Sequence, residues 1–99
     1  MVKHIILWNF KSEMSESEKL SAAEKIKTGL EGLLGQIEGL AEIKVYASTI
    51  ESSNADLMLD STFVDQASLA GYQINPKHVE VATFVRSVME SRRCIDFEL

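Results

Sequence analysis

Apolar residues occupy every second position at the start of the chain, and this period of two predicts a β-strand over Val2–Phe10. His4 and Ile6 lie on one face of that strand, and Ile5 and Leu7 lie on the other. Both faces are apolar at their centre. Since a strand exposed on one side needs only one apolar face, we expect something to cover each of them.

The same alternation predicts three more strands. Those over Glu42–Ile50 and Ala55–Phe63 flank the polar run Glu51–Asn54, which is typical of the turn of an antiparallel hairpin. A last strand is predicted over Cys94–Leu99, where apolar and polar residues alternate again.

Apolar residues at helical spacing predict helices between these strands. Ser15 and Glu18 match a capping box, so a first helix is expected to begin there and to continue as far as Ile37. Asp65 is a suitable N-cap for a short second helix that runs through Tyr72.

A third helix is expected to begin at Asn75 and Pro76, because asparagine favours the N-cap and proline the first helical position. His78 lies in its first turn, on the same face as Ala82, Val85 and Met89. Arg92 and Arg93 are expected near the negative end of this helix.

The resulting order is strand, helix, strand, strand, helix region, strand, which indicates one α+β domain over residues 1–99. The ferredoxin-like βαββαβ arrangement accounts for it, with one antiparallel sheet, the first strand near its middle, and helices on one face. The other face would be bare and apolar. We therefore expect a homodimer formed through the face that carries Ile5 and Leu7.

Composition narrows the function classes. A formal charge of −5 and a pI of about 4.9 disfavour nucleic-acid binding, because phosphate repels an acidic chain. The single cysteine excludes an internal disulfide framework. No signal peptide or membrane-spanning run is recognised, so the cytoplasm is the expected location.

The segment from Tyr72 to His78 is the densest candidate for chemistry. The imidazole of His78 should face the sheet, and His4 lies on the face of the first strand that the helices cover. The two histidines and Tyr72 are therefore expected to share a pocket between helices and sheet. An acid–base role and a purely structural role, with His78 bonded to a backbone carbonyl, both remain open at this point.

Asp96 shares a strand face with Cys94 and is a candidate to orient the imidazole of His78, or else a solvated acid. Cys94 is expected to be a small buried apolar residue rather than a nucleophile. No ligand-type spacing is present, so neither a metal nor another cofactor is expected.

The chain resembles the stress-responsive dimeric α+β barrel (Dabb) family over nearly its whole length. The resemblance rests on the opening run Val2–Lys11, on Ile37–Leu40, on Phe63, and above all on Tyr72–Val79 with its Tyr-x-x-x-Pro-x-His corner. The family usually has a second histidine just before this proline, where the chain has Asn75.

The resemblance implies a ferredoxin-like monomer and a dimer in which two sheets close a barrel. A plant polyketide cyclase of the family uses a tyrosine and a histidine that match Tyr72 and His78. Carried over, His78 would be the base, Tyr72 the acid that polarises a carbonyl, and Asp96 the group that holds the imidazole. The expected ligand pocket is lined by His4, Ile6, Trp8, Leu59, Met89 and Cys94.

Two functions are consistent with this resemblance. One is a stress-response dimer that binds a small apolar ligand and has no established reaction. The other is a cofactor-free enzyme, similar to a polyketide cyclase or a lyase, with a Tyr/His acid–base pair. The sequence leaves the choice open.

Overall fold

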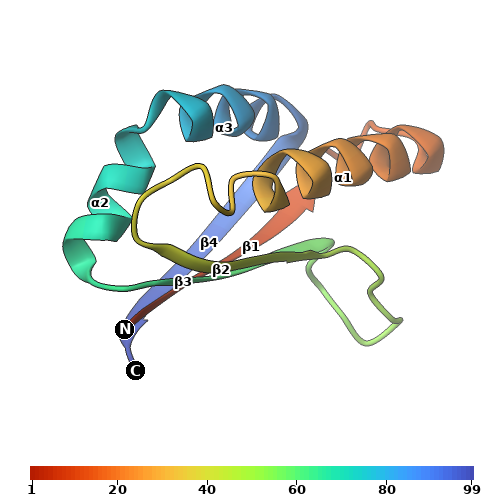
Figure 1. Cartoon of the computed structure of the whole chain (residues 1–99). Coiled ribbons are helices and arrows are strands. Elements are labelled where there is room, and N and C mark those ends of the chain that lie inside the picture. The colour runs from red at the N-terminus through yellow and green to blue at the C-terminus, as the bar shows by residue number, and fades with distance from the viewer.

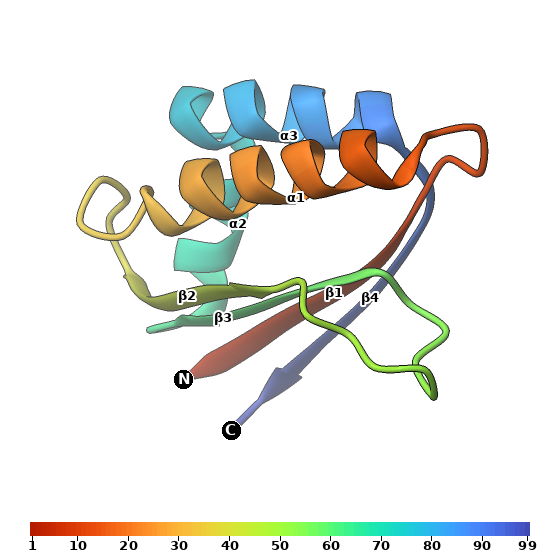
Figure 2. The same cartoon turned by 90° about the vertical axis from the view of Figure 1, so that its right-hand side faces the viewer.

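The computed structural model describes residues 1–99 as one antiparallel sheet with three helices on one face (Figures 1 and 2). The strands pair in the order β2-β3-β1-β4, so β1 is central and β4 is an edge. This confirms the predicted α+β, ferredoxin-like class. The elements in chain order are β1 (Val2–Phe10), α1 (Glu16–Glu31), β2 (Leu40–Tyr46), β3 (Leu57–Phe63), α2 (Gln66–Ile74), α3 (Pro76–Val88) and β4 (Met89–Glu98).

The predicted helix starts are confirmed. Ser15 caps α1 in a complete capping box with Glu18, and Asp65 caps α2 by accepting a hydrogen bond from the backbone N–H of Ser68. Asn75 caps α3, with Pro76 in its first turn. None of the three helices combines the length and the apolar character needed to cross a membrane.

The predicted end of the first helix was wrong. The chain leaves the α-helical conformation after Glu31, with Gly32 as C-cap, and continues through turns to β2. Leu33 and Ile37 are nevertheless buried within those turns, which explains why apolar spacing continued past the end of the helix. The hairpin is confirmed as antiparallel, but its strands are shorter than predicted and residues 47–56 form the loop between them.

The last strand also begins earlier than predicted, at Met89 instead of Cys94. Residues 89–93 pair with the end of β1, and this ladder of backbone hydrogen bonds outweighs the helical spacing of the local sequence. Arg92 and Arg93 therefore lie in a strand and point to opposite faces of the sheet, rather than near the end of α3.

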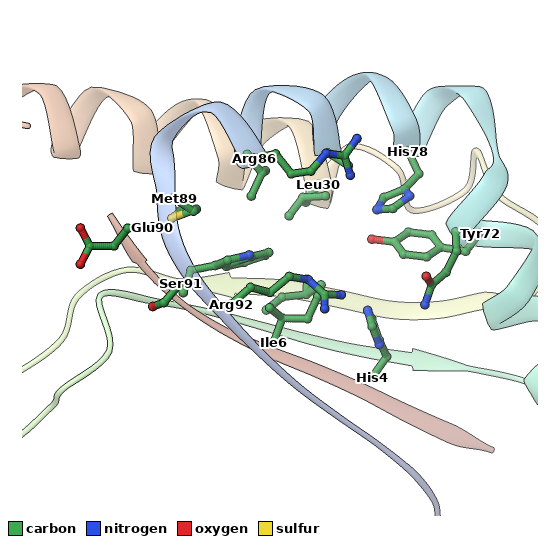
Figure 3. Close-up of a pocket in the computed structure, with 15 residues that line it drawn as sticks. His4, Ile6, Leu30, Tyr72, His78, Arg86, Met89, Glu90, Ser91 and Arg92 are labelled. Carbon is green, nitrogen blue, oxygen red and sulfur yellow. The ribbon is translucent and has the colours of Figure 1, made fainter. Parts of the chain in front are cut away.

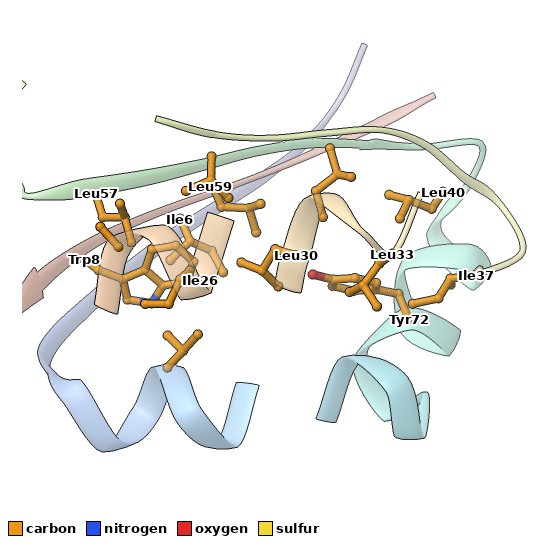
Figure 4. Close-up of a cluster of buried hydrophobic side chains, with 14 of the residues drawn as sticks. Ile6, Trp8, Ile26, Leu30, Leu33, Ile37, Leu40, Leu57, Leu59 and Tyr72 are labelled. Atoms are coloured by element: carbon orange, nitrogen blue, oxygen red, sulfur yellow. The ribbon is translucent and has the colours of Figure 1, made fainter. Parts of the chain in front are cut away.

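The core lies between the helices and the sheet (Figure 4). Ile6 and Trp8 of β1 and Leu57 and Leu59 of β3 meet Ile26 of α1 there, all nearly inaccessible to solvent. The predicted orientation of β1 is thus confirmed, with His4 and Ile6 on the helix-facing side.

No part of the chain covers the opposite face of the sheet, which we call the outer face. Leu7 is 40% exposed and Ile95 is 59% exposed. The β2–β3 loop leaves the sheet on this side (Figure 2). The bare apolar face predicted from the sequence is confirmed.

Candidate functional site

A pocket of about 450 Å³ lies between α3 and the helix-facing side of the sheet (Figure 3). This volume is in the range of small-molecule sites. Of the residues expected to line it, His4, Ile6, Trp8, Leu59 and Met89 do so, and Cys94 does not. Its further lining residues are Leu30, Tyr72, Gln73, His78, Ala82, Val85, Arg86, Glu90, Ser91 and Arg92.

The corner between α2 and α3 brings Tyr72 and His78 together. Tyr72 is in the last turn of α2, and Asn75 ends that helix by donating its backbone N–H to the Tyr72 carbonyl. Because Pro76 then restarts the chain at once as α3, His78 returns to the same side. The two rings lie 4.0 Å apart between centroids, at 30°.

The polar atoms of this pair are buried without partners. Neither the Tyr72 hydroxyl nor His78 Nδ1 has a hydrogen-bond partner in the chain. Burial raises the pKa of Tyr72 far above its ordinary value. Burial also lowers the pKa of His78; the nearby backbone of Gln73 and Tyr72 opposes this shift, and His4 and Arg86 add to it. Near neutral pH the phenol therefore keeps its proton as a donor, and the imidazole is uncharged.

His4 is the third polar group of this end of the pocket, 6.2 Å from Tyr72 between ring centroids. Its Nδ1 lies 2.5 Å from Asp96 Oδ1, because His4 and Asp96 are direct cross-strand partners in β1 and β4. This contact engages Nδ1 and leaves the second ring nitrogen of His4 available for another hydrogen bond.

The expectation that Asp96 orients His78 was therefore wrong. Strand pairing directs its carboxylate to His4, while Nδ1 of His78 has no partner. Asp96 supports the pocket from behind His4 and does not line it.

Cys94 is exposed, against the expectation that it is buried. It is on the open edge strand, with its Sγ 3.4 Å from Asp96 Oδ1 and 3.7 Å from His4 Nδ1. Partial burial of the thiol, followed by the neighbouring Asp96 carboxylate, raises the pKa of Cys94, so it is a poor nucleophile.

The three side chains His4, Cys94 and Asp96 offer metal-ligand atoms within 4.8 Å of one another. Two ligands of a tetrahedral zinc ion at about 2.1 Å are separated by about 3.4 Å. The His4–Asp96 distance of 2.5 Å is much shorter, so this arrangement is a hydrogen-bonded pair rather than a metal centre.

Sequence reasoning missed several polar or charged residues of the pocket. Gln73, Arg86, Glu90 and Arg92 line it, and none had been singled out for it. Arg92 was expected near the end of the third helix. Had the strand been extended back to Met89, alternation from Asp96 would have put Arg92 on the pocket side.

Comparisons with known proteins agree with this fold. Residues 2–99 match the family described as the stress responsive A/B barrel domain. No curated protein sequence matches the chain significantly.

Solved structures of similar fold include proteins with and without a described activity. A dimeric protein of unknown function from Bacteroides fragilis is 28% identical with a TM-score of 0.93, over 99% of this chain and 95% of that one. A dimeric ferredoxin-like protein of unknown function from Thermobifida fusca is 19% identical with a TM-score of 0.84, over 99% and 90%. The hydroxynitrile lyase from Passiflora edulis is 16% identical with a TM-score of 0.75, over 99% and 92%. The last two show the fold alone.

Proposed function

The chain belongs to the stress-responsive A/B barrel domain family, and we propose that it binds a small, largely apolar molecule in the pocket between its helices and its sheet. The observation that carries this proposal is a pocket of about 450 Å³ whose two buried polar atoms, on Tyr72 and His78, have no partner in the chain. Buried polar groups are nearly always hydrogen-bonded, so a ligand that supplies the missing bonds is favoured here.

The size of the pocket limits the ligand. A cavity of about 150 Å³ holds one benzene molecule. The pocket here has about three times that volume, enough for an aromatic ring with a short side chain or a molecule of similar bulk.

Trp8 provides the test, because it is the single tryptophan of the chain and lines the pocket. Its emission is followed during titration with three neutral amides of increasing length: benzamide, hydrocinnamamide and phenylbutyramide. We expect a saturable change. Ala82→Phe fills the pocket and should weaken binding at least about tenfold, since a ligand cannot share space with a packed ring.

Ala67→Phe is the matched control, because Ala67 is exposed on α2 and does not line the pocket. It should bind as the wild type does. Equal binding by wild type and Ala82→Phe contradicts the proposed location, and the absence of binding by all probes contradicts the proposed function.

A second candidate is a cofactor-free enzyme, similar to a cyclase or lyase, in the same pocket. It is favoured by the contact between a neutral imidazole and a protonated phenol, since such a pair accepts one proton and donates another near neutral pH. Product formation distinguishes it from binding alone. His78→Ala should then lower turnover by about a hundredfold to ten-thousandfold.

We also propose that the protein is a homodimer formed through the outer face. Ile5 and Leu7 lie on it, together with the exposed Ile95 and Phe97 of the edge strand. Several exposed apolar side chains on one sheet face of so small a chain indicate a partner surface. The Bacteroides fragilis and Thermobifida fusca proteins of the same fold are described as dimeric.

A further inference from the structure

We propose that the ligand of this pocket carries a carboxylate, bound between Arg86 and Arg92, and that its apolar body lies against the core side of the pocket. This rests on the proposed binding function and names the ligand class. The observation behind it is a pair of arginines from two different elements, α3 and β4, in one pocket.

The two guanidinium groups face the same region of the pocket. Figure 3 shows both side chains running toward the end where His4, Tyr72 and His78 lie, Arg86 from the helix side and Arg92 from the sheet side. A carboxylate has two oxygens that accept hydrogen bonds in its plane, which suits donors arriving from two directions.

Neither arginine has an acidic partner in the chain. The ion pairs are Lys3–Asp60, His4–Asp96, Lys19–Glu16 and Lys27–Glu31. Glu90 is the acidic residue that lines the pocket, and its carboxylate accepts a hydrogen bond from the backbone N–H of Ser12 at 2.9 Å. In a chain with fifteen acidic and ten basic side chains, two arginines without acidic partners in one pocket favour an external anion.

The buried phenol adds a third donor. Tyr72 is 1% exposed, its hydroxyl has no partner, and burial raises its pKa so that it stays protonated. A protonated phenol donates to a carboxylate oxygen, which would satisfy the hydroxyl.

The other residues that line the pocket indicate the character of the ligand beyond its carboxylate. Ile6, Trp8, Leu59 and Val85 form an apolar wall with no charged group. Apolar surface buried against such a wall favours binding in proportion to its area. The site therefore fits a small monocarboxylate with a hydrocarbon or aromatic body, rather than a sugar acid.

The test compares each neutral amide with its isosteric acid: benzoate, hydrocinnamate and phenylbutyrate. The Trp8 signal should show that the acid binds at least about tenfold more tightly than its amide. Arg86→Gln and Arg92→Gln should each weaken binding of the acid by about ten- to a hundredfold and weaken binding of the amide much less, because only the acid loses a charge-assisted hydrogen bond. Both arginines are exposed, so these variants should fold.

Arg93→Gln is the matched control. It removes the same charge one position away, but Arg93 pairs with Leu7 on the outer face. It should bind the acid as the wild type does. An equal loss in Arg93→Gln, or equal affinity for acid and amide, overturns the carboxylate assignment and leaves the proposed function standing. If neither acids nor amides bind, both proposals are overturned.

Discussion

At the scale of single residues, burial decides which protonation states the pocket presents. Tyr72 is held as a neutral donor and His78 as a neutral imidazole, because both are desolvated by the surrounding elements. His4 differs, since an acid on the neighbouring strand binds its Nδ1. The positive charges of the pocket belong to the exposed Arg86 and Arg92, whereas the buried Tyr72 and the half-buried His78 are uncharged hydrogen-bonding groups.

His78 makes stability depend on pH. Its pKa in the folded protein is below the ordinary value of 6.5, so between these two values only the unfolded chain takes up the proton. The contribution to stability is complete above about pH 6.5 and is lost as the pH falls toward the pKa of the folded state. We expect the urea midpoint of the wild type to fall more between about pH 7.5 and 5 than that of His78→Gln.

The comparison isolates one group because glutamine has no titrating proton in this range. His4 and Arg86 are retained in both proteins, so the electrostatic potential that they produce at position 78 is the same. Identical pH dependence in the two proteins would show that His78 is not held uncharged in the folded state.

At the scale of elements, two short connections fix how neighbouring helices and strands meet. The Asn75–Pro76 corner fixes how α3 leaves α2. Gly39 leads into β2 with φ +82, a conformation that side chains disfavour, and its carbonyl accepts a hydrogen bond from the backbone N–H of Val64. This contact ties the start of β2 to the end of β3.

Gly39→Ala should be strongly destabilising. The left-handed backbone costs an alanine about 1 to 2 kcal/mol, and the added Cβ would also collide with the Ser68 side chain on α2. Gly35 is the matched control, with φ +84 and open space around its Cβ position. In chemical unfolding, Gly39→Ala should lose at least about 1 kcal/mol more than Gly35→Ala, and an equal loss would show that the Ser68 contact yields without cost.

At the scale of the whole molecule, the sheet divides the chain into a filled side and an open side. The helices bury the inner face, while Leu7, Tyr46, Ile95 and Phe97 remain exposed on the outer one. Ile50, at 75% exposed, lies in the loop that leaves the sheet on the same side (Figure 2). A second copy of the chain packed against the outer face would bury both these side chains and Ile50.

Leu7→Asp should convert a dimer to a folded monomer. A carboxylate placed on this face loses its hydration when a second copy covers it, and the neighbouring Arg93 offsets only part of that cost, whereas in a separate chain it stays in water. Light scattering at micromolar concentration should give half the wild-type mass, with the helical circular dichroism retained.

Leu20→Asp makes the same exchange on α1, where Leu20 is 73% exposed away from the outer face. It should leave the mass unchanged. A wild-type protein that is monomeric at this concentration contradicts the proposed dimer.

Local patterns in the sequence were enough to predict much of this molecule. The capping box at Ser15, the Asn75–Pro76 corner and the alternation in β1 each reflect forces within a few residues, namely backbone hydrogen bonding and strand geometry. From them followed the order of elements, the α+β class and the bare outer face. Position along the helix also placed His78 on the same side as Ala82 and Val85, which line the pocket with it.

Tertiary structure alone decided the points at which local signals compete. Residues 89–93 are compatible with helical spacing, and pairing with β1, about eighty or more positions earlier in the chain, makes them a strand. That pairing turns Arg92 toward the pocket and sets Asp96 opposite His4 rather than near His78. The conformation of such a segment depends on which strand pairs with it, because a ladder of backbone hydrogen bonds outweighs the local preference of a few residues. The pairing strand is distant in the sequence, so the segment's own residues do not reveal it.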